Sequence, residues 1–130
     1  MRTDHVTPAD AASPSAAVQA AARRIRVFIG ESARPRVALV LGSGLGDYAD
    51  RLEGGRAIAY DEIGFPASSV VGHEGRLVYG RPPGSRVEVL VMQGRVHAYE
   101  GHALQTVVLP VRALVKSGCD VVVLTNAAGA

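Results

Sequence analysis

Two short apolar runs constrain the fold of this chain more than any other feature of its sequence. They are Val37–Leu41 and Val121–Leu124, and each is followed by a loop of glycine or small polar residues. A continuous apolar run of this length, closed by turn-forming residues, is typical of a strand buried on both faces. We therefore expect both runs to be strands in the interior of a sheet.

Two other segments carry the periodicity of amphipathic helices. The first starts at Ser13 and Pro14, which suit an N-cap followed by the first helical position, and it stops at Gly30. The second covers residues 106–117 and ends before a glycine. Because Pro110 lacks a backbone N–H, it must either begin this helix or kink it.

Further strands are expected at residues 57–60, 76–79 and 87–92, the last two joined by a turn rich in glycine and proline. Helices and strands in this order predict an α/β fold with a mixed, mostly buried central sheet flanked by helices. The folded unit should span residues 14–130. Residues 1–13 lack periodicity and are expected to form a mobile tail.

Composition excludes several classes of partner. The 130 residues carry 14 Lys and Arg against 12 Asp and Glu, a net charge of +2, without the basic excess typical of nucleic-acid binding. The apolar runs are far shorter than the roughly 20 residues that cross a bilayer, and the N-terminus does not resemble a secretory signal. We therefore expect a cytoplasmic protein. Cys119 is the only cysteine, which rules out an internal disulfide and predicts an inert core thiol.

A glycine-rich loop follows the first apolar run, at residues 42–46 (Gly-Ser-Gly-Leu-Gly). Its backbone amides and the Ser43 hydroxyl could close around an anion such as phosphate. A dinucleotide fingerprint is the alternative, since Asp61 falls where a ribose-binding acid would lie, but Asp47 stands where the third glycine is needed. The loop is not followed by a lysine with Ser or Thr, which excludes a P-loop. A plain tight turn stays open as the structural interpretation.

The densest group of polar side chains follows the strand expected at residues 87–92. Arg95, His97 and Tyr99 occupy alternate positions, so an extended backbone would point all three the same way. A zinc site at His97, Glu100 and His102 is disfavoured because the spacing does not match helical two-histidine motifs. A solvated loop is the structural alternative.

One shared site is the simplest interpretation of these loops. In open α/β sheets the ligand crevice forms outside the carboxyl ends of the strands. The loops after the three strongest strands would meet there. Ser43, Arg95 and His97 would then surround a small oxyanion, with Tyr99 beside it, and phosphate fits this set of donors best.

Four segments, in this order, resemble the trimeric purine nucleoside phosphorylases. They are residues 42–46 (quoted above), 65–80 (Phe-Pro-Ala-Ser-Ser-Val-Val-Gly-His-Glu-Gly-Arg-Leu-Val-Tyr-Gly), 94–101 (Gly-Arg-Val-His-Ala-Tyr-Glu-Gly) and 125–129 (Thr-Asn-Ala-Ala-Gly). The resemblance runs from about residue 16 to the end. It covers roughly the N-terminal half of such an enzyme, so we expect a truncated nucleoside phosphorylase-like fold.

The resemblance also implies roles for individual residues. Those that would hold inorganic phosphate are Ser43, Arg95, His97 and the backbone N–H of Ala127. Those that would surround the nucleoside are Tyr99 and His73 at the ribose and Ala128 at the purine. Glu100 would orient His97, and the catalytic set implied is His97, Arg95, His73 and Glu100.

The implied reaction is phosphorolysis of a purine ribonucleoside or deoxyribonucleoside to free base and sugar 1-phosphate, as in purine salvage. Phosphate is a co-substrate, no metal or organic cofactor is required, and the family association implies a homotrimer. The family residues that set base preference lie in the C-terminal half. Two alternatives stay open: a methylthioadenosine phosphorylase-like enzyme, disfavoured because that group resembles Gly-Gly-Thr-Gly at the first loop, and an inactive phosphate-binding fragment.

Overall fold

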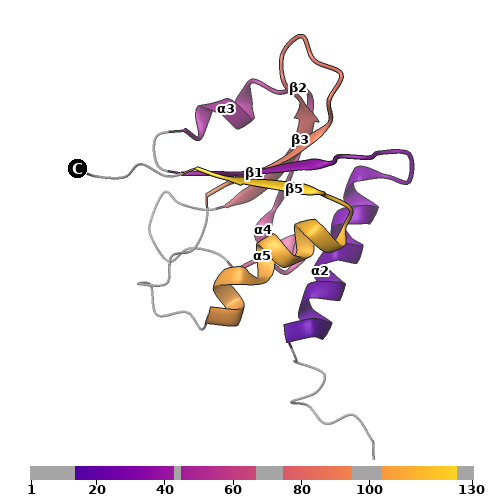
Figure 1. Ribbon diagram of the computed structural model, residues 1–130, viewed down its shortest axis with the longest axis vertical. Helices are drawn as coiled ribbons and strands as arrows, with labels where there is room; N and C mark the ends of the chain where they lie inside the picture. Colours follow the sequence, from indigo (N-terminus) through magenta and orange to yellow (C-terminus); the bar gives the residue numbers. More distant parts are fainter. Residues whose placement is uncertain (1–13, 43–44, 67–74, 95–103, 126–130) are drawn as a thin grey trace, which may run out of the picture.

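The computed structural model describes residues 14–42, 45–66, 75–94 and 104–125 (Figure 1). The predicted tail at residues 1–13 lies outside these ranges. The elements in chain order are α2 (Pro14–Ile29), β1 (Val37–Leu41), α3 (Asp47–Asp50), β2 (Glu53–Ala59), α4 (Tyr60–Ile63), β3 (Arg76–Arg81), β4 (Val89–Gln93), α5 (Leu104–Lys116) and β5 (Val121–Leu124). This alternation confirms the predicted α/β class.

The described strands form one mixed sheet in the order β2-β3-β4-β1-β5. β1 lies between β4 and β5 and pairs in parallel with both. β2, β3 and β4 form an antiparallel arm on one side of β1. The mixed sheet expected from the sequence is therefore confirmed.

Helices cover both faces of the sheet unequally. In Figure 1, α2, α4 and α5 lie on one side of the strands and α3 lies on the other. Side chains alternate between the faces, so Leu90 and Met92 belong to the core cluster beneath α2 and α5, whereas Val91 belongs to the cluster beneath α3. Each of these three side chains is at most 2% exposed. Burying one such side chain stabilises the fold by roughly 1.5–3 kcal/mol.

The helical predictions are largely confirmed. α2 buries Val18, Ala22, Ile25 and Ile29 on one stripe, and it ends at Gly30, whose φ of 92° suits glycine. α5 runs over Leu104–Lys116 rather than residues 106–117, so Pro110 lies inside it and does not begin it. No helix in the described part of the chain is long and apolar enough to cross a membrane.

The prediction for β2 was wrong at both ends. The strand covers Glu53–Ala59 rather than residues 57–60, and Tyr60 begins α4 instead of ending the strand. Gly54 and Gly55 lower the strand propensity of the first half, and the pairing register shifts between Glu53 and Arg56. Alternation alone therefore could not locate its start.

Two further strand predictions need correction. β5 has the predicted bounds, but it lies at the edge of the described sheet, where Val121, Val123 and Leu124 are 50%, 40% and 58% exposed. It is therefore not buried on both faces, and β1 is its sole neighbour among the described strands. β4 begins at Val89, not at residue 87, because the backbone N–H of Val87 donates to Ser85 Oγ, 3.0 Å away, in the preceding turn.

Candidate functional site

The sheet brings the flanks of all four sequence motifs to the end of the sheet where β1, β4 and β5 finish, which is called the site edge below. Leu41 at the end of β1 pairs with Gln93 at the end of β4, and Val40 pairs with Leu124 at the end of β5. β3 runs the opposite way, so its first residue, Arg76, also pairs with Gln93. Adjacent strands are about 4.8 Å apart, so four chain segments leave or enter the sheet within roughly 15 Å.

The predicted site residues themselves lie outside the described residues. They are Ser43, His73, Arg95, His97, Tyr99, Glu100, Ala127 and Ala128. The residues that flank these loops are described: Gly42, Gly75, Gly94 and Thr125. The sheet holds the starts and ends of these loops. Three side chains carry out this anchoring, and sequence analysis named none of them for it.

Thr125 joins the end of β5 to the end of β1. Its hydroxyl accepts a hydrogen bond from Gly42 N at 2.9 Å and donates to Val40 O at 2.8 Å. Its backbone N–H also donates to Val40 O, at 3.0 Å. One residue therefore ties the glycine-rich loop that starts at Gly42 to the small-residue loop that follows β5. These are the two loops that should supply Ser43 and the N–H of Ala127.

Gln93 performs a similar function between β4 and the glycine-rich loop. Its side-chain amide donates to Gly46 O at 2.7 Å, and its amide oxygen accepts a hydrogen bond from the Arg76 guanidinium. Arg76 also pairs with the carboxylate of Asp50 in α3. The chain Asp50–Arg76–Gln93–Gly46 thus links four segments on the α3 face of this edge. The guanidinium and the carboxylate are about half exposed, so their ion pair orients the two side chains but contributes little to the free energy of unfolding.

On the opposite face of the edge, the hydroxyl of Tyr60 donates a hydrogen bond to the carbonyl of Gly94. Gly94 has a φ of 97°, a backbone conformation that favours glycine, and the chain turns there as it leaves β4. The loop that carries Arg95 and His97 therefore starts from a defined point. A polar residue at the end of a buried run was the signal available for Gln93, but no local pattern marked Tyr60.

The one cysteine contributes nothing to this edge. Cys119 is buried next to the start of β5, with its thiol 3.5 Å from Pro35 O. Burial, with a smaller effect from the Asp120 carboxylate, raises the pKa of the Cys119 thiol to about 11. It is therefore protonated at neutral pH, and its burial confirms the predicted place in the core. The described residues contain no group of three or more potential metal ligands.

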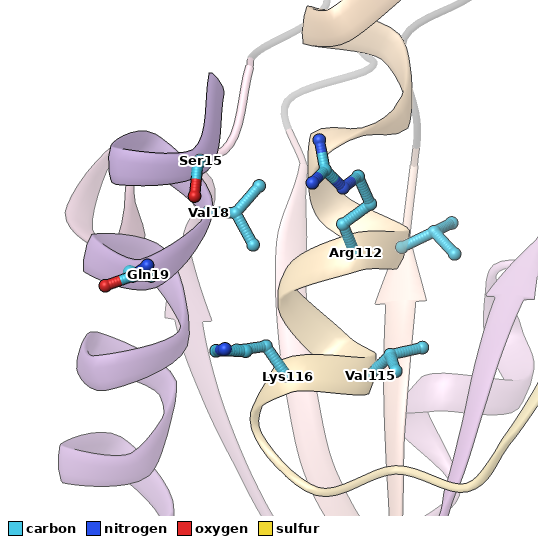
Figure 2. A pocket seen from close by; sticks show the side chains of 7 residues that line it. Ser15, Val18, Gln19, Arg112, Val115 and Lys116 are labelled. Atoms are coloured by element: carbon cyan, nitrogen blue, oxygen red, sulfur yellow. The ribbon is translucent and has the colours of Figure 1, made fainter. Parts of the chain in front are cut away.

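A separate groove lies between α2 and α5 (Figure 2). Figure 2 shows Val18 from α2 and Lys116 from α5 extending into the space between the two helices. Its volume is about 300 Å³, and its lining residues are Ser15, Val18, Gln19, Val111, Arg112, Val115 and Lys116. None of these belongs to the four motifs or to the three anchoring residues. The groove is therefore distinct from the candidate site.

A family model described as the phosphorylase superfamily matches residues 36–130. The chain belongs to the phosphorylase superfamily. The matched region contains all four motifs and every strand of the described sheet. It begins just before β1, so α2 precedes the region that defines membership.

Relatives within the phosphorylase superfamily are similar over most of this chain. Purine nucleoside phosphorylase 1 of Geobacillus stearothermophilus is 48% identical over 96 residues, which is 73% of this chain and 34% of the relative. Purine nucleoside phosphorylase 1 of Bacillus subtilis is 43% identical over 113 residues, 86% of this chain and 40% of the relative. The chain thus spans between a third and two fifths of the length of these relatives.

Solved structures show the same fold. A crystal structure of purine nucleoside phosphorylase from Schistosoma mansoni with acetate superimposes with a TM-score of 0.75 at 40% identity, covering 87% of this chain and 40% of that chain. A purine nucleoside phosphorylase in complex with ribose-1-phosphate also gives 0.75 at 40% identity, covering 86% and 40%. These neighbours confirm the predicted nucleoside phosphorylase-like fold.

Proposed function

We propose that residues 14–130 form the phosphate- and ribose-binding part of a purine nucleoside phosphorylase. The enzyme would cleave purine ribonucleosides or deoxyribonucleosides with phosphate, giving free base and the sugar 1-phosphate. The observation that carries this proposal is the convergence of four motif-bearing segments at one edge of the sheet. Relatives named purine nucleoside phosphorylase, one of them in complex with ribose-1-phosphate, support it.

In this proposal, inorganic phosphate is held by Ser43, Arg95, His97 and the backbone N–H of Ala127. These donors come from the loops after β1, β4 and β5, whose starts lie side by side. Arginine suits the role because its guanidinium can grip two phosphate oxygens at once. Glu100 would hold the imidazole of His97 in the orientation that faces the anion.

The nucleoside would lie beside this phosphate. Tyr99 and His73 would contact the ribose, and Ala128 would line the purine pocket. Breaking a glycosidic bond develops positive charge at C1′, so an anion fixed next to that carbon stabilises the transition state and then bonds to it. This chemistry needs a well-placed phosphate rather than a protein nucleophile or a metal ion. A homotrimer in the cytoplasm completes the proposal.

The direct test is release of hypoxanthine from inosine by the purified protein, with phosphate present and with phosphate omitted. We expect release with phosphate and formation of ribose 1-phosphate in equal amount. Release without phosphate would indicate hydrolysis and contradict the proposal. No release from a folded sample would favour the inactive-fragment alternative. Light scattering behind a sizing column would test the trimer in the same preparation.

A matched pair of arginine variants tests the site assignment. Arg95→Ala should raise the KM for phosphate by tenfold or more, since one charge-assisted bidentate contact is worth about 1.5–3 kcal/mol, and should change the KM for inosine much less. Arg86→Ala removes an exposed arginine from the turn between β3 and β4 and serves as the control. Equal losses for phosphate and inosine in the Arg95 variant would refute the assigned role.

A further inference from the structure

Tyr60 is held rigidly at the edge of the sheet where the candidate site lies. It is the first residue of α4 and is 2% exposed. Its ring packs against Phe65, with ring centroids 5.4 Å apart, and belongs to the same core cluster as Leu77 and Met92. Moving this ring would require repacking of the core beneath α2 and α5. The hydroxyl group of Tyr60 is therefore held in a fixed position.

The hydroxyl of Tyr60 uses that fixed position to hold Gly94. It donates to the Gly94 carbonyl, immediately before Arg95, where the backbone adopts a φ of 97°. Because the peptide unit is planar, holding this carbonyl fixes the direction in which the chain leaves toward Arg95. Burial raises the pKa of Tyr60, so its hydroxyl stays a protonated donor throughout the neutral and moderately alkaline range.

The same residue also contacts the segment that enters β3. The backbone N–H of Tyr60 donates to Gly75 O at 3.2 Å. A Cβ atom at position 75 would lie 1.8 Å from the ring carbon Cε2 of Tyr60, so only glycine permits this approach. Residue 75 follows directly on the segment that contains His73. Tyr60 thus contacts the residue that precedes β3 within one motif and the first residue of another.

We propose that Tyr60 is a positioning residue for the phosphate and ribose subsites. Its hydroxyl sets the start of the loop that carries Arg95 and His97, while its ring and backbone set the end of the loop that carries His73. This inference rests on the proposed function for the identity of the ligand. The loop-positioning part rests on the contacts at Gly75 and Gly94 alone. Tyr60 touches neither phosphate nor sugar in this scheme.

Hydrogen exchange tests the positioning without requiring activity. Tyr60→Phe removes the hydroxyl and keeps the ring against Gly75. We expect amides in a peptide covering residues 95–103 to exchange about fivefold faster, the loss that one neutral hydrogen bond predicts. Tyr79→Phe is the matched control, because it removes a hydroxyl that donates to Glu88 Oε1 at 2.7 Å, away from this edge. Unchanged exchange in the Tyr60 variant, or an equal increase in the control, would overturn the proposal.

Binding of inorganic phosphate, measured by titration calorimetry, connects the loop to the site. Tyr60→Phe should raise the Kd for phosphate about fivefold, while Tyr79→Phe should leave it unchanged. Faster exchange with an unchanged phosphate Kd would overturn the role of Tyr60 in the phosphate subsite. If the unsubstituted protein binds no phosphate, the proposed function fails, and the exchange experiment alone still decides whether Tyr60 positions the loop.

Discussion

Thr125 offers the most direct energetic test of how the site edge is held together. Its hydroxyl accepts a hydrogen bond from Gly42 N at 2.9 Å and donates one to Val40 O at 2.8 Å. Thr125→Val keeps the size and β-branching of the side chain while removing both bonds. Thr125→Ser keeps both bonds while removing the methyl group. The two variants therefore separate the hydroxyl from the packing of the side chain.

The structure sets the size of the expected effect. Val40 O keeps a partner in the valine variant, because the backbone N–H of Thr125 still donates to it at 3.0 Å. Gly42 N loses its partner and is half-buried, so the variant should lose about 1–2 kcal/mol, the lower part of the range for an unpaired buried donor. Serine should lose less than about 0.8 kcal/mol, the value of one fully buried methylene, because Thr125 is itself half-buried.

Urea unfolding followed by far-ultraviolet circular dichroism measures both variants. With a slope of about 2 kcal/mol/M, a loss of about 1–2 kcal/mol moves the midpoint down by roughly 0.5–1 M at unchanged slope. The serine variant should move its midpoint by less than about 0.4 M, and so less far than the valine variant. A valine variant as stable as the serine variant, or more stable, would refute the reasoning that the hydroxyl joins β1 to β5.

Two further outcomes follow from buried groups. Gly75→Ala should lower the melting temperature by roughly 4–10 °C, because its Cβ would lie 1.8 Å from the ring of Tyr60. The decrease should be smaller when Tyr60 is also replaced by alanine. An equal decrease in both backgrounds would show that the ring is not the cause. Burial raises the pKa of Cys119 from 9.0 to about 11, so the folded state binds its proton more tightly than the unfolded state does. The resulting stability is complete below about pH 9 and is lost as pH rises toward about 11. Urea midpoints across this range should fall more steeply for the unsubstituted protein than for Cys119→Ala; parallel curves would contradict the assignment.

Sequence patterns predicted the parts of the fold that depend on local periodicity. The apolar run Val37–Leu41 and the amphipathic stripe of α2 are strong sequence signals. In each, the apolar side chains recur at the spacing of the element and pack against the core. The start of β2 was not predictable in this way, since its pairing with β3 compensates for two glycines that are poor strand formers. Burial of β5 was overestimated because an apolar run does not reveal which elements cover the two faces of its strand or whether it lies at the edge of the sheet.

The candidate site likewise has a part that local sequence patterns predicted and a part that they could not. Glycine spacing and clustered polar residues identified the loops, and the paired ends of β1, β4 and β5 explain why the loops share one edge. The anchoring side chains could not be found from spacing, because each acts on a backbone atom remote in sequence. Thr125 and Gly42 are 83 positions apart, and Tyr60 and Gly94 are 34 apart. Such contacts depend on the fold, which local patterns do not specify.

The position of β1 between β4 and β5 has a consequence for the order in which the chain folds. Tyr79 and Glu88, which meet across the β3–β4 hairpin, are 9 positions apart, whereas the contact between Gly42 and Thr125 closes a loop of 83. Longer loops cost more entropy to close, so we expect the hairpin to pair before β1 inserts between β4 and β5. Pulse-labelling during refolding should therefore protect amides of β3 and β4 before those of β1 and β5. The edge at which the candidate site lies would be among the last parts of the molecule to form, and a chain interrupted late in folding would hold a finished hairpin without that edge.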